Sequence, residues 1–240
     1  MGKRAWIWPV LAVSCWPALA SAWVKDADRI MEQGRPTTTF DLDNDSIPFR
    51  RSDGLYTSGI RLTHSHRLRE AGGWRSIAWR FGQQLYTPKH VGTPPELLGP
   101  LDRPYAGWLY GSLNLASYTA TSYGSLELQL GVVGPSALGE QVQNNVHDFM
   151  NIDRALGWDY QLKDEPRRNL ILTRQWRFNT DPIWDDVAVG IVPTLTASLG
   201  NVQTFGAAGF AVRIGNELQA DFGPPRMRPS VSGSAFYQPD

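Results

Sequence analysis

Leu126-Glu127-Leu128-Gln129-Leu130-Gly131-Val132 is the stretch that decides the fold. Apolar side chains occupy every second position, and Glu127, Gln129 and Gly131 lie between them. Because successive side chains of a β-strand point to opposite faces of the sheet, the pattern predicts a strand with one apolar and one polar face. A charged residue opposite leucines fits a membrane barrel with a polar lumen, although a soluble sandwich would also place Glu127 outward.

Similar alternation recurs along the chain, in segments close in length to the ~9–11 residues that a tilted membrane strand needs. The predicted strands are Thr37–Asp43, Tyr56–Arg67, Trp74–Tyr86, Tyr105–Tyr118, Tyr123–Val132, Asn169–Phe178, Asp186–Ser198 and Gly206–Ile214. The ten Trp, eight Tyr and nine Phe suit a barrel whose aromatic residues sit at the lipid interfaces. The predicted fold class is therefore all-β: a transmembrane antiparallel β-barrel of the outer membrane, with about eight strands visible and a short helix in an outer loop.

The connections between these segments alternate in length. Long links follow the first, third and fifth predicted strands, and short turns follow the second, fourth and sixth. Outer-membrane barrels show this alternation, with long loops outside and short turns on the periplasmic side. If the N-terminus starts on the periplasmic side, strand parity brings the links 44–55, 87–104 and 133–168 to one outer rim.

The two ends of the chain carry expectations of their own. Lys3 and Arg4 precede an apolar run that ends in a small-residue cleavage site, so residues 1–22 are predicted to be a signal peptide and 23–240 the barrel domain. The only cysteine, Cys15, lies in that signal, which leaves the mature chain without a thiol for catalysis. The Pro-rich stretch 223–229 predicts that further C-terminal strands are missing from this sequence.

His147 is the first candidate for acid–base chemistry. The chain has four histidines, and this one lies in a polar, helix-like segment just beyond the Tyr123–Val132 strand. Histidine titrates near neutral pH and commonly serves as a general base. Gln143 lies four residues earlier, on the same helical face, where it can orient the ring. The alternative interpretation is a histidine satisfied by neighbouring amides on an external loop.

Asp43-Asn44-Asp45 closes the first predicted strand. Carboxylate and amide oxygens without sulfur suit a hard cation, above all calcium, although the spacing is not that of an EF-hand. Alternation sends Asp43 and Asp45 to one side and Asn44 to the other, so all three serve one site only if the strand breaks there. The alternative interpretation is that these three residues form a solvated junction between strand and loop and bind no ion.

Thr57, Lys89 and the pair His64 and His66 are further polar candidates. Thr57 begins the return strand, where it can donate a hydrogen bond to substrate or orient a water, and Lys89 can meet a phosphate or an oxyanion. Parity places the two histidines toward the periplasmic end, as lumen or interface residues or, less readily, as a metal pair. The absence of a Gly-x-Ser-x-Gly elbow, a His-Glu-x-x-His motif and a glycine-rich phosphate loop removes the main support for serine-hydrolase and zinc-protease interpretations.

The sequence from about Phe40 to Asn216 resembles the outer-membrane lipid A 3'-O-deacylases. The motifs that carry the resemblance, in family order, are Asn44-Asp45, Tyr56-Thr57-Ser58-Gly59, Gln84-Leu85-Tyr86-Thr87-Pro88, Asp102-Arg103-Pro104-Tyr105-Ala106-Gly107, Gly131-Val132-Val133-Gly134-Pro135, Gln143-Asn144-Asn145-Val146-His147 and Gly157-Trp158-Asp159-Tyr160-Gln161. The resemblance implies a twelve-stranded barrel, a site on the lumen side at the outer leaflet, and dependence on calcium.

The resemblance also assigns roles by position. His147 corresponds to the general base, Asn44 and Asp45 to the polar and calcium-linked residues, and Thr57 to a site hydroxyl. Supporting positions fall on Gln143 and Asp153. The family's loop lysine has no clean counterpart, because Lys89, the nearest lysine, lies a few residues early.

Together with these residues, the resemblance implies a carboxylic ester hydrolase of the outer membrane that removes the 3'-linked acyloxyacyl chain of lipid A. A water activated by His147 would attack the ester, assisted by Ca²⁺. The expected partners are lipopolysaccharide as substrate and the barrel assembly machinery; the balance of 23 basic and 23 acidic residues gives no basic field for nucleic acid. The alternatives are a non-enzymatic outer-membrane barrel, a glycerophospholipid acyl hydrolase and an inactive fragment.

Overall fold

The computed structural model describes residues 26–44, 56–88, 103–183, 186–220 and 222. Several sequence-based predictions fall outside these ranges. They concern the signal peptide at residues 1–22, Asp45, Lys89 and the C-terminal stretch 223–240.

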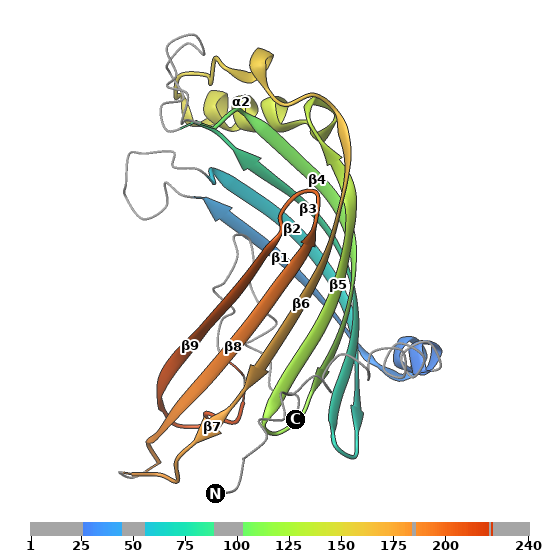
Figure 1. Ribbon diagram of the computed structural model, residues 1–240, viewed down its shortest axis with the longest axis vertical. Coiled ribbons are helices and arrows are strands. Elements are labelled where there is room, and N and C mark those ends of the chain that lie inside the picture. The colour runs from blue at the N-terminus through green and yellow to red at the C-terminus, as the bar shows by residue number, and fades with distance from the viewer. Residues whose placement is uncertain (1–25, 45–55, 89–102, 184–185, 221, 223–240) are drawn as a thin grey trace, which may run out of the picture.

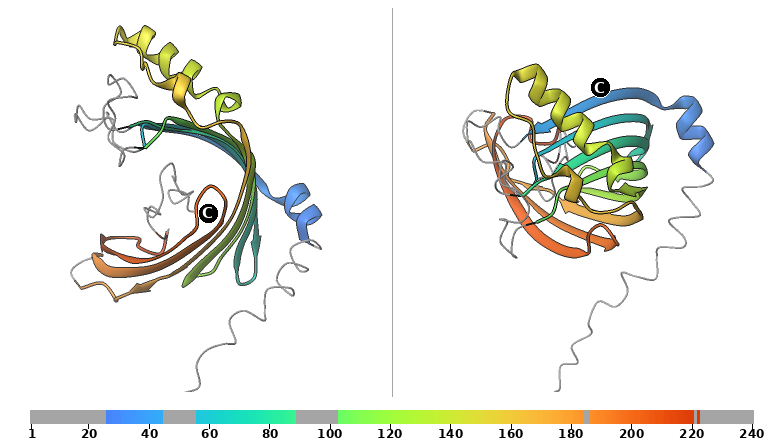
Figure 2. Two further views of the ribbon diagram at one scale, coloured as in Figure 1. Left: turned by 45° about the horizontal axis from the view of Figure 1, so that its top comes forward. Right: turned by 90° about the horizontal axis from the view of Figure 1, so that it is seen from above.

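In the part of the chain that the structure describes, nine antiparallel strands form one strongly curved sheet (Figures 1 and 2). They are β1 Arg35–Asn44, β2 Ser58–Glu70, β3 Gly73–Tyr86, β4 Ala106–Tyr118, β5 Ser122–Val133, β6 Glu165–Trp176, β7 Phe178–Asn179, β8 Ala188–Gly200 and β9 Phe205–Gly215. Neighbours in the sheet follow chain order, and the short β7 continues the line of β6 along β8. Every predicted strand is confirmed to within a few residues, and the curved antiparallel wall confirms the predicted fold class. Within the described residues the sheet is open between β1 and β9.

The two faces of the sheet differ as the alternation predicted. Glu127 is only 1% exposed, whereas its neighbour Leu128 is 44% exposed. We call the face that carries Glu127 the inner face and the face that carries Leu128 the outer face. The outer face presents large exposed apolar side chains on most strands: Phe40, Leu62, Phe81, Leu113, Leu128, Leu130, Leu195, Phe210, Val212 and Ile214. An apolar outer face with a polar inner face is the pattern of a barrel that spans a bilayer.

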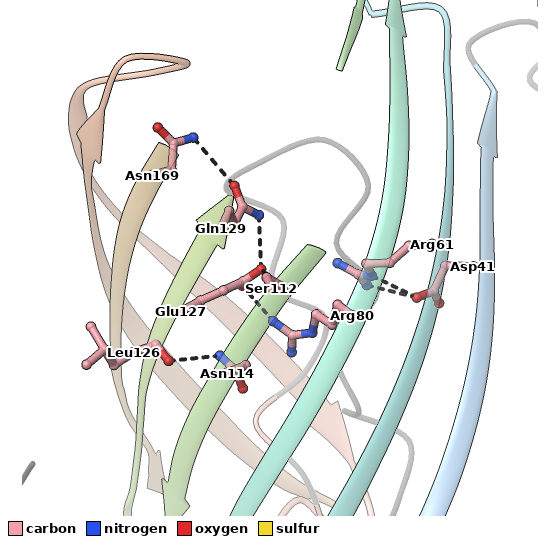
Figure 3. A network of polar contacts seen from close by, with 9 residues as sticks. All are labelled: Asp41, Arg61, Arg80, Ser112, Asn114, Leu126, Glu127, Gln129 and Asn169. Carbon is pink, nitrogen blue, oxygen red and sulfur yellow. Dashed lines mark hydrogen bonds and ion pairs between the residues drawn. The ribbon is translucent and has the colours of Figure 1, made fainter. Parts of the chain in front are cut away.

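A polar network crosses the inner face (Figure 3). Glu127 accepts hydrogen bonds from Arg80 at 2.6 Å, Ser112 at 3.0 Å and Gln129 at 2.9 Å. Asn169 donates to Gln129 at 3.5 Å, so the network links β3, β4, β5 and β6. A second buried pair joins β1 to β2, because the Arg61 guanidinium donates to Asp41 through two nitrogens at 3.1 and 2.9 Å. Charges at this depth persist only when they are paired, so the network holds the inner wall together.

A short helix at residues 26–33 lies on the convex side of the sheet, near the β2–β3 turn (Figure 2). Arg29 pairs with Glu70, Asp26 pairs with Arg75, and Arg75 Nε lies 3.0 Å from Glu70 Oε2. Ile30 of this helix is fully buried. In the described part of the chain, no helix is long and apolar enough to cross a membrane.

Candidate active site

Strand parity is confirmed within the described residues. The last residues of β1, β3 and β5 and the first residues of β2, β4 and β6 meet at one end of the sheet. The helix α2, Gly139–Met150, lies at this same end, so a short helix does occur in the long link 133–168 (Figure 1). The sequence argument therefore placed Asn44, Thr57 and the His147 segment correctly at a common rim.

Close packing against the ends of β3 and β4 positions α2. Leu85, Tyr105, Ala155 and Trp158 form a buried cluster, and Val142 of α2 packs against it. Gly139 lies so close to the cluster that a Cβ there would come within 2.6 Å of the Trp158 ring and 3.1 Å of Leu85. The first turn of α2 is therefore fixed on the sheet, since a closely packed interior leaves it no room to shift.

Gln143 anchors the middle of the helix. Its side chain is buried, and Oε1 accepts a hydrogen bond of 2.8 Å from Trp158 Nε1. Because an indole nitrogen only donates, this contact fixes which end of the amide is oxygen. The buried Nε2 of Gln143 has no hydrogen-bond partner. Gln143 thus holds α2 in place through Trp158, and the hydrogen bond that orients the His147 ring comes from elsewhere.

His147 is oriented by the turn that ends α2. Asn151 adopts the left-handed conformation with φ 56°, and Ile152 N–H donates to His147 O at 2.9 Å. This reversal brings Asp153 back to the helix, where its main-chain oxygen lies 2.6 Å from His147 Nδ1. A carbonyl oxygen only accepts, so Nδ1 carries the proton and Nε2 of the neutral ring keeps its lone pair. The geometry therefore presents a base at Nε2.

An ion pair closes the same turn on its exposed side. Arg154 donates to both carboxylate oxygens of Asp148, at 2.8 and 2.5 Å. The Arg154 hydrogen bond lowers the pKa of Asp148 below its ordinary value. On the other side of the turn, Ala155 N–H donates to Asn144 Oδ1 at 3.1 Å. The residues on either side of Asp153 are thus tied to α2, which keeps its carbonyl at the His147 ring.

Thr57 and Asn44 form a second group at the rim. Asn44 pairs with Ser58 in the β1–β2 register, and Thr57 directly precedes Ser58. The Thr57 N–H donates to Leu85 O at 2.9 Å, and its buried hydroxyl shares a 2.6 Å hydrogen bond with the hydroxyl of Thr87. Leu85 belongs to the cluster under α2, so it connects this group to the His147 group.

The predicted site residues therefore fall into two sets, and two further residues lie outside the described ranges. His147, Gln143 and Asp153 belong to α2 and the turn after it, whereas Asn44 and Thr57 lie at the ends of β1 and β2. Asp45 and Lys89 lie outside the described ranges. Those ranges contain no group of three or more His, Cys, Asp or Glu side chains that could hold a metal. Sequence reasoning named Thr87, the hydroxyl partner of Thr57, and Trp158 only as parts of motifs and gave neither a role.

The family profile described as outer membrane protein LpxR matches residues 7–240. The chain belongs to the LpxR family. Among solved structures, LpxR from Salmonella typhimurium superimposes with a TM-score of 0.67 at 22% sequence identity, over 78% of this chain and 66% of that one. No curated protein matches the sequence. The family assignment confirms the resemblance found in the sequence and places the protein in the outer membrane, and the Salmonella structure shows the same barrel fold.

In this LpxR-family protein the left-handed residue after α2 gives a direct test of the turn. Asn151→Val should strain the backbone by about 1–2 kcal/mol, because a Cβ branch is disfavoured at φ 56°. Asn151→Gly is the matched control, since glycine adopts this conformation freely. Deuterium uptake at the Ile152 amide should rise in the valine variant and stay near wild type in the glycine variant. Equal protection in both variants would show that the left-handed residue does not order the turn.

A second test concerns Asp164, which directly precedes β6 and holds the turn before α2. It accepts hydrogen bonds from Ser136 N at 2.8 Å and Ser136 Oγ at 2.7 Å, and Ser136 belongs to the 3₁₀ helix η3, Pro135–Ala137. The hydrogen bonds from Ser136 lower the pKa of Asp164. This contact should contribute fully above pH ~3.9, the ordinary aspartate pKa, and be lost as the pH falls through the lower folded value.

The measurement is an NMR titration of the Asp164 carboxyl carbon. Ser136→Ala removes the hydroxyl donor but keeps the main-chain donor, so the pKa of Asp164 should rise part of the way toward its ordinary value. Ser136→Thr keeps a hydroxyl and should leave the pKa low. An unchanged pKa in the alanine variant would show that the hydroxyl does not stabilise this carboxylate.

Proposed function

We propose that this LpxR-family protein is a lipid A 3'-O-deacylase, a carboxylic ester hydrolase that removes the 3'-linked acyloxyacyl chain. The 2.6 Å contact between His147 Nδ1 and Asp153 O carries the proposal. It leaves Nε2 of the neutral ring as a proton acceptor at the rim, which this proposal assigns to the outer leaflet, where the ester of lipid A lies. Family membership and the fold support the same conclusion.

The reaction follows from the orientation of His147. Nε2 takes a proton from a water molecule as the water oxygen bonds to the ester carbonyl carbon, and the carbonyl electron pair moves to its oxygen. When that pair returns, the bond to the 3' oxygen breaks and the proton on Nε2 passes to the leaving alkoxide. The products are a 3'-hydroxyl and a free acyloxyacyl acid. Asp153 O stabilises the transient imidazolium through Nδ1–H, as the orienting acceptor does in other histidine-base sites.

Direct attack by water is favoured over an acyl-enzyme intermediate. The Thr57 hydroxyl pairs with Thr87, and no hydroxyl in the described ranges forms a hydrogen bond with His147. A hydroxyl nucleophile needs a base within hydrogen-bond reach. Thr57 is therefore assigned a role in binding substrate or orienting water at the β1–β2 rim.

The end of β1 fits a calcium ion by the chemistry of its donors. Asn44, the last residue of β1, and Asp45, which follows it in the sequence, offer oxygen donors, the kind that a hard cation selects. In this proposal Asn44 and Asp45 would hold Ca²⁺, which would supply positive charge to polarise the ester carbonyl. Lys89 is assigned a supporting role toward the negative charge of substrate, and Gln143 keeps α2 in position.

Mass spectrometry of lipid A tests the function. The protein is folded in detergent and incubated with purified lipid A, with calcium and with a chelator. The expected result is that lipid A loses the mass of the 3'-acyloxyacyl chain in the sample with calcium and keeps it in the sample with the chelator. Fatty acid release from phosphatidylethanolamine but not from lipid A would identify a glycerophospholipid hydrolase instead. A folded barrel that is inactive on both lipids would favour the non-enzymatic alternative.

A further inference from the structure

His64 and His66 form a close pair on the outer face of β2. Their Nε2 atoms lie 3.2 Å apart, and the two rings are tilted by 72°. His64 Nδ1 lies 2.9 Å from Thr38 Oγ1 on β1, and the His66 ring meets Trp79 of β3 edge-on at 6.4 Å. Both Nε2 atoms therefore converge on one point while neighbouring strands hold the rings.

The register of β1–β3 shows where this pair lies on the outer face. Phe40, Leu62 and Phe81 are aligned across the three strands and form a fully apolar row. The next outward-facing row toward the β2–β3 turn holds Thr38, His64 and Trp79. Beyond it on the same face, helix 26–33 forms ion pairs with Glu70 and Arg75. A change from apolar to aromatic and charged side chains marks the membrane–water interface. The pair thus lies at the border of the lipid-facing band, within reach of water.

We propose that His64 and His66 bind a divalent transition-metal cation that prefers imidazole, with zinc as the representative ion. Two nitrogen ligands on a tetrahedral zinc, each at ~2.0–2.1 Å, lie ~3.3 Å apart. The observed separation of 3.2 Å matches this spacing, so the ion can enter with little movement of either ring. Imidazole nitrogens select zinc, copper and nickel over calcium.

Thr38 acts as a positioning residue for the pair. Its hydroxyl accepts the Nδ1–H of His64 in the metal-binding tautomer, which directs the Nε2 lone pair at the ion. His66 Nδ1 is buried without a hydrogen-bond partner, so the contact with Trp79 orients that ring instead. The described residues provide no third His, Cys, Asp or Glu ligand at this point, so water completes the coordination sphere and the ion is exchangeable.

This site is separate from the proposed reaction and does not rest on it. The pair lies on the outer face toward the β2–β3 turn, whereas His147 and the end of β1 lie at the opposite end of the sheet. A borderline cation on two nitrogens also differs chemically from a calcium ion on oxygens. An inactive protein could therefore still bind zinc, and an active one could fail to bind it.

Zinc titration of the full chain folded in detergent tests the site, with excess calcium present to fill any oxygen site. The wild type should bind zinc, and the double variant H64N/H66N should lose that binding. Thr38→Val should weaken it by about 10-fold, the size of many outer-shell effects. The control His147→Asn should bind as the wild type does. Wild-type affinity in the folded double variant would overturn the proposal.

A second measurement avoids variants. Diethylpyrocarbonate modifies free imidazoles, and peptide mass spectrometry locates the modified histidines. Zinc should protect His64 and His66 in the wild-type protein and leave His147 reactive. Copper bound to the same protein should show hyperfine coupling to two nitrogens in its electron paramagnetic resonance spectrum. Unprotected His64 and His66 at saturating zinc would overturn the assignment even if the double variant failed to fold.

Discussion

His147→Asn should lower kcat for lipid A deacylation by about 10²–10⁴-fold, the usual contribution of a general base. The ring presents Nε2 as a base because Nδ1 donates to Asp153 O at 2.6 Å. Asparagine keeps a polar side chain of similar size but has no group that takes up a proton near neutral pH. The measurement is the initial rate of 3'-acyloxyacyl release at saturating lipid A and calcium.

The control for this prediction is His66→Asn, which changes another partly exposed histidine far from the rim. It should deacylate lipid A at the wild-type rate. Heat-modifiable migration on gels should show both variants folded, since His147 belongs to an external loop. Near-normal turnover by folded His147→Asn would remove the histidine from the mechanism, and loss of folding would assign it a structural role.

Glu127→Ala should lower the free energy of unfolding by about 3–5 kcal/mol, the cost of removing one partner of a buried ion pair. Glu127 is 1% exposed and accepts from Arg80, Ser112 and Gln129. Its removal takes away the carboxylate that pairs with the Arg80 guanidinium on the inner face. Urea unfolding of the protein in lipid bilayers measures the change.

Two variants frame this prediction. Glu127→Gln keeps an acceptor for Ser112 or Arg80 but removes the charge, so its loss of stability should be smaller than that of the alanine variant. Asp181→Ala removes an exposed carboxylate and should change stability by less than about 0.5 kcal/mol. If Glu127→Ala unfolds at the same urea concentration as Asp181→Ala, the inner network does not stabilise the barrel.

The strands were predictable because the two faces of this sheet meet different solvents. Lipid requires apolar side chains outside and the lumen tolerates polar ones, so each strand displays a period of two in the sequence. The pattern from Leu126 to Leu130 was confirmed for this reason, with Glu127 inside and the leucines outside. Helix 26–33 escaped prediction because its ion pairs with Glu70 and Arg75 depend on residues distant in the sequence.

The candidate site was predictable only in part. Parity alone placed Asn44, Thr57 and His147 at one rim, since each antiparallel strand reverses direction. The helix pattern suggested that Gln143 orients His147. In the structure Gln143 accepts a hydrogen bond from Trp158, and the His147 ring is oriented by its hydrogen bond to the Asp153 carbonyl. Every residue has a main-chain carbonyl, so the residue type at position 153 does not indicate that its carbonyl accepts this hydrogen bond. The contact could therefore not be predicted from the sequence.

The sequence by itself determined the strands, the rim at which the candidate residues gather and the resemblance that the LpxR family profile confirms. These properties depend on local alternation, strand parity and short motifs, and all three can be recognised from the linear order of the residues. Only the tertiary structure decided the tautomer of His147, the pairing of Thr57 with Thr87 and the 3.2 Å approach of His64 to His66. Those contacts depend on backbone reversal and on how side chains pack, and a pattern of residue types fixes neither.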